Sequence, residues 1–143
     1  MENAKKIQKL LNDRGYKTYA CGGFVRDHIL GIAPKDIDLA TQATPEESIK
    51  ILNDANIKVI PTGLQHGTVT AVLNGEQYEI TTLRHDVDCD GRHAQVVYTK
   101  SFKEDALRRD FTFNALYMDL VTGHIWDFHN GIKDLKNGLI RFV

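Results

Sequence analysis

The stretch ACGGFVRDHILGIAPKDIDLAT, residues 20–41, constrains the fold most strongly, because its last six residues combine a buried-strand pattern with two carboxylates. Asp36 and Asp38 stand two residues apart, so in a strand their side chains point to the same face, with Cα atoms about 6.6 Å apart. Like charges this close raise each other's pKa unless a cation lies between them. The pair therefore indicates a metal site on one face of a strand.

Gly22 and Gly23 stand before a helix-like run, where a strand is expected to turn into a helix. Backbone N–H groups and the helix dipole can hold phosphate oxygens at such a point, and glycine lets the backbone approach closely. Arg26 would reach the same phosphates from the first helical turn. Considered alone, this pattern is more commonly a turn and a surface charge, but its position before the two aspartates favours phosphate binding.

The rest of the chain alternates helical and strand patterns, with no internal repeat, low-complexity stretch or linker. Helices are expected at about 3–14, 24–30, 45–55 and from Ser101 toward Arg109. Strands are expected at about 16–21, 36–41, 57–60, 67–73, 77–83, 115–120 and 124–128. Capping-box patterns at Thr44 and Ser101 mark two helix starts, and Asn74-Gly75 is typical of a tight hairpin turn. The alternation predicts an α/β domain with a mixed sheet, in which residues 85–95 are polar and irregular.

Length and composition are consistent with one domain that buries a core, since 42% of the 143 residues are hydrophobic. No run of about 18 apolar residues indicates a membrane span, and the first residues lack the apolar segment of a secretory signal. Cys21 and Cys89 are too few for a disulfide framework, so we expect a reducing compartment, the cytoplasm. The net charge of −1 excludes a domain that grips nucleic acid by bulk positive charge.

Five motifs in the order GGFVRD, DIDLAT, TGLQHGTVT, YEITTLR and EDALRRDFTFNALYMD resemble the head domain of class II CCA-adding enzymes, the tRNA nucleotidyltransferases, and of related bacterial poly(A) polymerases. Both belong to the polymerase-beta-like nucleotidyltransferase superfamily. The resemblance runs from about Gly15 to the last residue. It implies the α/β fold of that superfamily, a mixed central sheet flanked by helices, with residues 1–143 as the head, or catalytic, domain.

The resemblance implies that Asp36 and Asp38 bind Mg²⁺, an ion that prefers hard oxygen ligands. The metal would activate the 3′-hydroxyl of tRNA for in-line attack on the α-phosphate of CTP or ATP, and so add CMP and AMP without a template. Glu79 is expected to be the third catalytic carboxylate, because in this superfamily one often comes from a neighbouring strand. The alternative is that all three carboxylates are solvated at the edge of the sheet.

The segment EDALRRD, residues 104–110, allows two assignments. As a bare pattern, Glu104 to Arg108 matches the EDxxR motif that selects the incoming base in the family. Because RRDFTFNAL follows directly, the segment resembles instead an earlier motif that contacts the nucleotide. We therefore assign Arg108, Arg109 and Asp110 to substrate binding, with Asp110 at the ribose 2′-hydroxyl, although either arginine could equally complement the helix dipole.

The family continues beyond the head into helical neck, body and tail domains that carry base selection and tRNA binding. This chain stops at NGLIRFV, an apolar strand-like run. We therefore expect a head domain without neck, body and tail, either a fragment or one half of a split enzyme whose partner chain supplies them. By itself such a head is expected to be inactive or unselective, with the tRNA 3′ end bound mainly through those missing or separate domains.

Three alternatives stay open at this point. One is a poly(A) polymerase head, although TGLQHGTVT resembles the CCA-adding version more. Another is a small antibiotic or toxin–antitoxin nucleotidyltransferase, which shares the glycines and the aspartate pair but not RRDFTFNAL. The third is a nucleotide-binding module without turnover. The polar residues 85–93 offer histidine, aspartate and Cys89 side chains, but their spacing does not fit a tetrahedral metal site, and in the family a flexible loop lies here.

Overall fold

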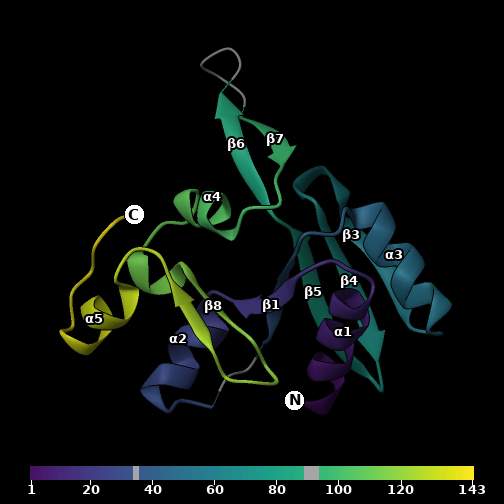
Figure 1. The fold of residues 1–143 in the computed structure, drawn as a ribbon, viewed down its shortest axis with the longest axis horizontal. Helices are drawn as coiled ribbons and strands as arrows, with labels where there is room; N and C mark the ends of the chain where they lie inside the picture. Colours follow the sequence, from purple (N-terminus) through teal and green to yellow (C-terminus); the bar gives the residue numbers. More distant parts are fainter. Residues whose placement is uncertain (34–35, 89–93) are drawn as a thin grey trace.

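The computed structural model describes residues 1–33, 36–88 and 94–143 (Figure 1). Its helices are α1 (Glu2–Asp13), α2 (Gly23–Leu30), α3 (Pro45–Asp54), α4 (Phe102–Leu107) and α5 (Gly131–Lys136), with short 3₁₀ turns at η1 (Leu64–His66) and η2 (Thr112–Asn114). Its strands are β1 (Thr18–Cys21), β2 (Asp38–Thr41), β3 (Lys58–Gly63), β4 (Thr68–Leu73), β5 (Glu76–Thr82), β6 (Arg84–Asp88), β7 (Ala94–Tyr98), β8 (Leu116–Met118) and β9 (Ile125–Asp127). Within these residues no helix has the length and apolar character needed to cross a membrane.

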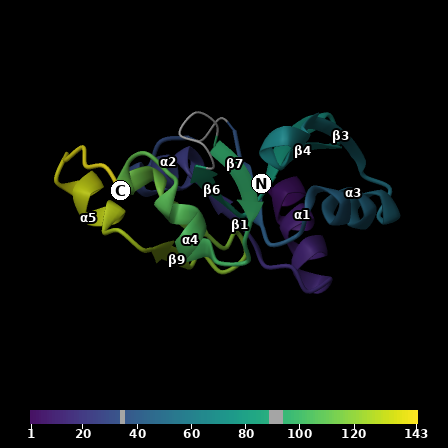
Figure 2. The same ribbon diagram turned by 90° about the horizontal axis from the view of Figure 1, so that it is seen from above.

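Seven strands form one mixed sheet in the order β3-β4-β5-β2-β1-β8-β9. The central pair β2 and β5 runs parallel, and the other neighbouring pairs in this sheet run antiparallel. Strands β6 and β7 pair only with each other and project from the sheet beyond α4 (Figure 1). In both views α3 and α5 lie at opposite ends of the molecule (Figures 1 and 2). The predicted α/β class with a mixed central sheet and flanking helices is confirmed.

Two helix starts were predicted from capping boxes. Both helices begin there, but only the capping box at α3 has both of its hydrogen bonds. At α3, the Thr44 hydroxyl accepts from the Glu47 N–H and the Glu47 carboxylate accepts from the Thr44 N–H. At α4, the Ser101 hydroxyl accepts from the Glu104 N–H, but the Glu104 carboxylate instead accepts from the Thr99 hydroxyl. Each helix therefore begins at the predicted residue, because the side chain that caps it is local in sequence.

Two hairpin turns connect antiparallel strands, and the predicted turn at Asn74-Gly75 is one of them. Asn74 and Gly75 both have positive φ, 52° and 79°, as a tight turn between two antiparallel strands requires. Gly123, with φ of 78°, lies in the turn between β8 and β9. The register of β4 on β5 follows from the first of these turns.

The two faces of the sheet are covered differently. The larger core packs α1, α2 and α3 against one face, with Ile7, Leu11, Val25, Leu39, Leu52, Val69 and Ile80 among its buried members. The opposite face carries a smaller cluster under α4: Cys21, Ala40, Leu83, Ala106, Ala115 and Tyr117. Since side chains alternate along a strand, Leu39 faces the larger core and Asp38 faces the side of α4.

Three predictions about elements were wrong, and one helix was not predicted. Strand β2 begins at Asp38, so Asp36 lies outside it. Residues 85–95, expected to be irregular, include most of β6 and part of β7. These two strands need no alternating apolar pattern because they do not cover the core. Residues 89–93 of the predicted loop lie outside the described residues. Helix α5 was missed, since its first N–H groups are capped by Asp127 from β9 rather than by a residue at its own start. The final run contributes an isolated bridge, Phe111 to Phe142, instead of a strand.

Candidate active site

Strand register brings five side chains into one row across the face that α4 partly covers. From β8 to β4 the directly paired residues are Tyr117, Cys21, Asp38, Glu79 and Thr70. Neighbouring strands in a sheet lie about 4.8 Å apart, so each side chain in the row is next to the following one. Asp38 and Glu79 are therefore adjacent in the middle of the sheet.

A cavity of about 300 Å³ opens over these carboxylates. It is lined by Asp36, Ile37, Asp38, Thr70, Gln77 and Glu79. Asp36 reaches this cavity from the segment before β2, so the expected same-face spacing along one strand does not apply to the pair. The structure nevertheless brings all three predicted carboxylates to one cavity.

The electrostatics of Asp38 are unfavourable without a cation. Burial raises the pKa of Asp38, and the negative charges of Glu79 and Asp36 raise it further, while Arg109 acts in the opposite direction. Within the described residues no group of three or more His, Cys, Asp or Glu side chains is arranged to hold a metal ion by itself. Mg²⁺ is commonly bound by one or two carboxylates together with substrate phosphates and water. Asp36 and Asp38 therefore fit a metal that binds along with a phosphate-bearing substrate.

A second cavity, of about 330 Å³, meets the first at the two aspartates. Its lining comprises Gly23, Phe24, Arg26, Asp27, Ile32, Ala33, Asp36 and Asp38. Gly22 is the N-cap of α2 and has a φ of 68°, a conformation that favours glycine. Its N–H donates to the carbonyl of Leu116, so Gly22 belongs to the hydrogen-bonding of the sheet. The N–H groups of Val25 and Arg26 donate to the Gly22 carbonyl, so those of Gly23 and Phe24 are the donors at this helix end that lack a partner within the helix.

Arg26 lies over the start of α2, where a Cβ added to Gly23 would come within 3.3 Å of its guanidinium. Its Nε donates to Asp27 Oδ1 at 3.0 Å, and its Nη1 donates to Asn114 Oδ1 at 3.3 Å. The side chain remains 34% exposed. These contacts hold the Arg26 guanidinium at the edge of the second cavity, next to the first turn of α2.

Asn114 is a site residue that the sequence analysis did not select. Its Oδ1 accepts from Arg26, and its Nδ2 donates to Asp110 Oδ1 at 3.3 Å. The Asp110 carboxylate also accepts from the N–H of Phe111, which is the main reason that the pKa of Asp110 is lowered. Asn114 thus links two predicted substrate-binding residues, and its signal was its place in the quoted run RRDFTFNAL.

Asp105 is a second residue that was not predicted as part of the site, and it bonds to several residues around it. The side chain is fully buried and accepts four hydrogen bonds: from Arg84 N at 3.0 Å, Arg108 Nε at 2.9 Å, Arg109 Nη2 at 3.2 Å and Tyr117 Oη at 2.5 Å. Burial alone would raise the pKa of Asp105, but the two arginines and the donated hydrogen bonds outweigh it and lower the pKa. This carboxylate is therefore ionised and fixes the two arginines that follow it.

Arg109 extends from Asp105 toward the glycine turn. Its Nε donates to the Tyr117 hydroxyl at 3.2 Å, and its guanidinium lies 5.3 Å from the centre of the Tyr117 ring. A Cβ added to Gly22 would come within 3.5 Å of Arg109 Nη1. Arg109 thus supplies a buried positive charge between Asp105 and the end of β1, close enough to lower the pKa of Asp38.

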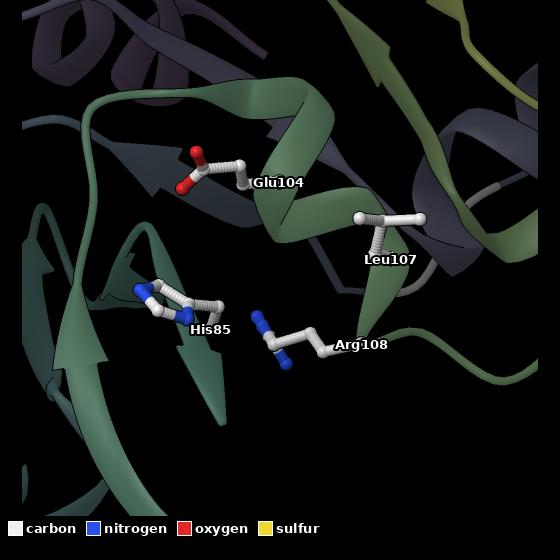
Figure 3. A pocket seen from close by; sticks show the side chains of 4 residues that line it. All are labelled: His85, Glu104, Leu107 and Arg108. Carbon is white, nitrogen blue, oxygen red and sulfur yellow. The ribbon is translucent and has the colours of Figure 1, made fainter. Parts of the chain in front are cut away.

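Arg108 faces a different space. It lines a cavity of about 480 Å³ together with His85, Glu104 and Leu107, between β6 and α4. Figure 3 shows the His85 ring, the Glu104 carboxylate and the Arg108 guanidinium directed into this space. The structure therefore brings Arg109 and Asp110 to the region of Gly22 and Arg26, and it does not bring Arg108 there.

The chain matches known proteins over nearly its full length. The family described as "Poly A polymerase head domain" matches residues 18–141. The human protein "CCA tRNA nucleotidyltransferase 1, mitochondrial" is 43% identical over 143 residues, which cover 99% of this chain and 33% of the relative. The "CCA-adding enzyme" of Staphylococcus epidermidis is 41% identical over 144 residues, which cover 99% of this chain and 35% of the relative. The chain thus spans about a third of the length of these curated relatives.

Solved structures give the same result. The crystal structure of the Bacillus stearothermophilus CCA-adding enzyme in complex with CTP is 39% identical, with a TM-score of 0.86, and the match covers 99% of this chain and 33% of that one. A tRNA nucleotidyltransferase complexed with a primer tRNA and an incoming ATP analog is 29% identical, with a TM-score of 0.73, over 94% of this chain and 38% of that one.

Proposed function

The chain belongs to the poly(A) polymerase head-domain family, and from this membership we propose that it is the catalytic head of a tRNA nucleotidyltransferase that transfers CMP and AMP to the 3′ end of tRNA. The observation that carries the proposal is the position of Asp38 at the junction of the two cavities, with Glu79 directly beside it in the cavity on the β5 side. The named relatives are CCA-adding enzymes, which favours CCA addition over poly(A) addition.

The cavity on the α2 side suits the triphosphate of CTP or ATP. The N-terminus of α2 offers the N–H groups of Gly23 and Phe24, and Arg26 lies over that turn. Arg109 adds a positive charge beside Gly22. These residues bind and orient the phosphates so that the α-phosphate lies near Asp38, where the two cavities meet.

The cavity on the β5 side suits the acceptor. Its three carboxylates disfavour a second polyphosphate but can accept hydrogen bonds from hydroxyl groups. Glu79 then orients the attacking 3′-hydroxyl on the side opposite to the triphosphate. This arrangement gives the in-line geometry that phosphoryl transfer requires.

Enzymes of this kind generally use a divalent metal ion, and Asp36 and Asp38 are the residues that would hold one. We infer Mg²⁺, because the available donors are carboxylate oxygens and a phosphate-bearing substrate. When bound, the ion would neutralise phosphate charge and make the acceptor hydroxyl more acidic. The raised pKa of Asp38, due to burial, Glu79 and Asp36, supports a cation at this point.

The α2-side cavity and the net charge of the chain indicate its binding partners. ATP and CTP fit the α2-side cavity, whereas a net charge of −1 gives little basis for holding a whole tRNA. We propose that helical neck and body domains, in the same longer chain or in a partner chain, hold the tRNA. The cytoplasmic location stays a prediction, since three of the similar relatives are named as mitochondrial proteins.

Extension of an end-labelled tRNA with CTP and ATP tests the proposed function. We expect C, C and A to be added when helical domains are supplied, and little or unselective addition by the chain alone. A ladder of A alone would indicate a poly(A) polymerase head. Transfer to an antibiotic or a protein instead of RNA would contradict the proposal, and so would nucleotide binding without any transfer in the presence of those domains.

Replacing Asp110 with alanine is expected to reduce the preference for ATP over dATP. We propose that Asp110 accepts a hydrogen bond from the 2′-hydroxyl of the incoming nucleotide, and a site built for a hydroxyl rejects an analogue that lacks it. Asn114 and Phe111 hold the carboxylate in place. The measurement is the ratio of the two dissociation constants in wild type and variant, with exposed Asp13→Ala as control. An unchanged ratio in Asp110→Ala would count against this role.

A further inference from the structure

The row of paired residues continues past Glu79 with hydroxyl groups. Thr70 on β4 is directly opposite Glu79, and it is 6% exposed and lines the same cavity. Its hydroxyl lies 2.8 Å from the hydroxyl of Thr62 on β3. A bonded pair of hydroxyl groups therefore lies one strand away from the carboxylates.

The surroundings of this pair are polar. Gln77 lines the cavity with Thr70, and a second hydroxyl pair, Thr68 on β4 and Thr81 on β5 at 2.9 Å, lies two residues along β4 from Thr70. Among the described residues that line the cavity, the charged ones are the three carboxylates. Such a surface repels phosphate groups, but it can exchange hydrogen bonds with the hydroxyl groups of a sugar.

We propose that Thr62 and Thr70 bind the 2′-hydroxyl of the acceptor's terminal ribose, so that this cavity distinguishes RNA ends from DNA ends. The inference rests on the proposed function, which puts the acceptor 3′-hydroxyl at Asp38 and Glu79. The 2′-hydroxyl is on the adjacent carbon, and Thr70 is about 4.8 Å further along the row.

The hydrogen-bonding capacity of the pair matches that partner. When one threonine donates its proton to the other, the second hydroxyl keeps a free O–H, and both oxygens keep acceptor positions. A 2′-hydroxyl is both donor and acceptor, so it can accept a hydrogen bond from the free threonine O–H or donate one to a threonine oxygen. This subsite is separate from Asp110, which concerns the ribose of the incoming nucleotide.

The test compares two oligonucleotide acceptors that differ only in the last sugar, ribose or 2′-deoxyribose, each with a free 3′-hydroxyl. Binding is measured by fluorescence anisotropy with Mg²⁺ present, and the KM for acceptor and for CTP is measured with helical domains supplied. One hydrogen bond to a hydroxyl corresponds to about a five-fold preference for the ribose end. Thr70→Val should remove this preference without changing the KM for CTP, and Thr70→Ser should retain it.

Thr68→Val is the matched control, because Thr68 lies on the same strand and face, also bonds to a threonine, and is not among the residues lining the cavity. It should keep the ribose preference. Extension without any ribose preference in wild type would overturn this inference alone, as would equal loss of preference in Thr68→Val and Thr70→Val. Absence of all extension and acceptor binding in wild type would instead overturn the proposed function.

Discussion

Asp38→Asn is expected to lower nucleotide transfer by about three orders of magnitude without unfolding the domain. The substitution removes the carboxylate at the junction of the two cavities, where the proposed metal and the attacking hydroxyl meet. It also relieves the repulsion from Glu79 and Asp36, so the melting temperature of the metal-free domain should hold or rise slightly. Thermal melts with and without Mg²⁺, beside the tRNA extension assay, measure both effects.

The same repulsion predicts a pH dependence. Burial, Glu79 and Asp36 raise the pKa of Asp38, so the folded state binds its proton more tightly than the unfolded state does. Stability of the metal-free wild type should therefore fall as pH rises from the unfolded pKa, about 3.9, through the raised folded pKa. Asp38→Asn should lack this contribution, whereas exposed Asp13→Asn should retain it. If Mg²⁺ stabilises Asp36→Asn and Asp38→Asn as much as wild type, the metal site is elsewhere.

Much of the fold could be predicted because its signals are local in sequence. The capping residues at Thr44 and Ser101 act within three residues, and the Asn74-Gly75 turn needs only two positive φ angles. Helix α5 escaped prediction because Asp127, which caps it, comes from the preceding strand. Strands β6 and β7 escaped because they pair away from the core and carry no apolar alternation.

In the candidate site too, residues with a local sequence signal could be predicted and contacts between distant segments could not. Asp36, Asp38 and Glu79 could be selected from residue type, pattern and resemblance, but the adjacency of Asp38 and Glu79 depends on the parallel register of β2 with β5. The contact of Asn114 with Arg26 could not be predicted, since the two residues are 88 positions apart. Long-range pairing thus determines both the spacing of the carboxylates and the polar contacts around them.

Asp105 shows how a motif can match for a different physical reason. Its pattern with Arg108 suggested a base-reading pair, which was rejected on position. In the structure the Asp105 carboxylate is buried and bonded to both arginines, to Tyr117 and to the N–H of Arg84. The spacings of three and four residues, from Asp105 to Arg108 and to Arg109, therefore serve two internal ion pairs.

This network gives the largest expected effect on stability. Asp105→Ala should lower the free energy of unfolding by roughly 3–5 kcal/mol, because it leaves Arg109 and Arg108 as uncompensated, largely buried charges. Tyr117→Phe, which removes a single hydroxyl, should cost about 1 kcal/mol. Glu104→Ala is the matched control, since this neighbouring carboxylate on α4 is exposed and should change stability by about 0.5 kcal/mol. Urea denaturation of the three variants gives these values.

The pH dependence of the network separates an ionic role for Asp105 from simple packing. Although burial opposes it, Arg109 and Arg108 lower the pKa of Asp105, so its contribution is present above about pH 4 and is lost as pH falls through the lowered value. The difference in stability between wild type and Asp105→Asn should therefore shrink at acid pH, whereas a packing defect would persist. Arg109 would also lose its anchor beside Gly22, so Asp105→Asn should weaken triphosphate binding even where it remains folded. A variant that binds CTP as wild type does and keeps a constant stability difference across pH would show that Asp105 does not position Arg109.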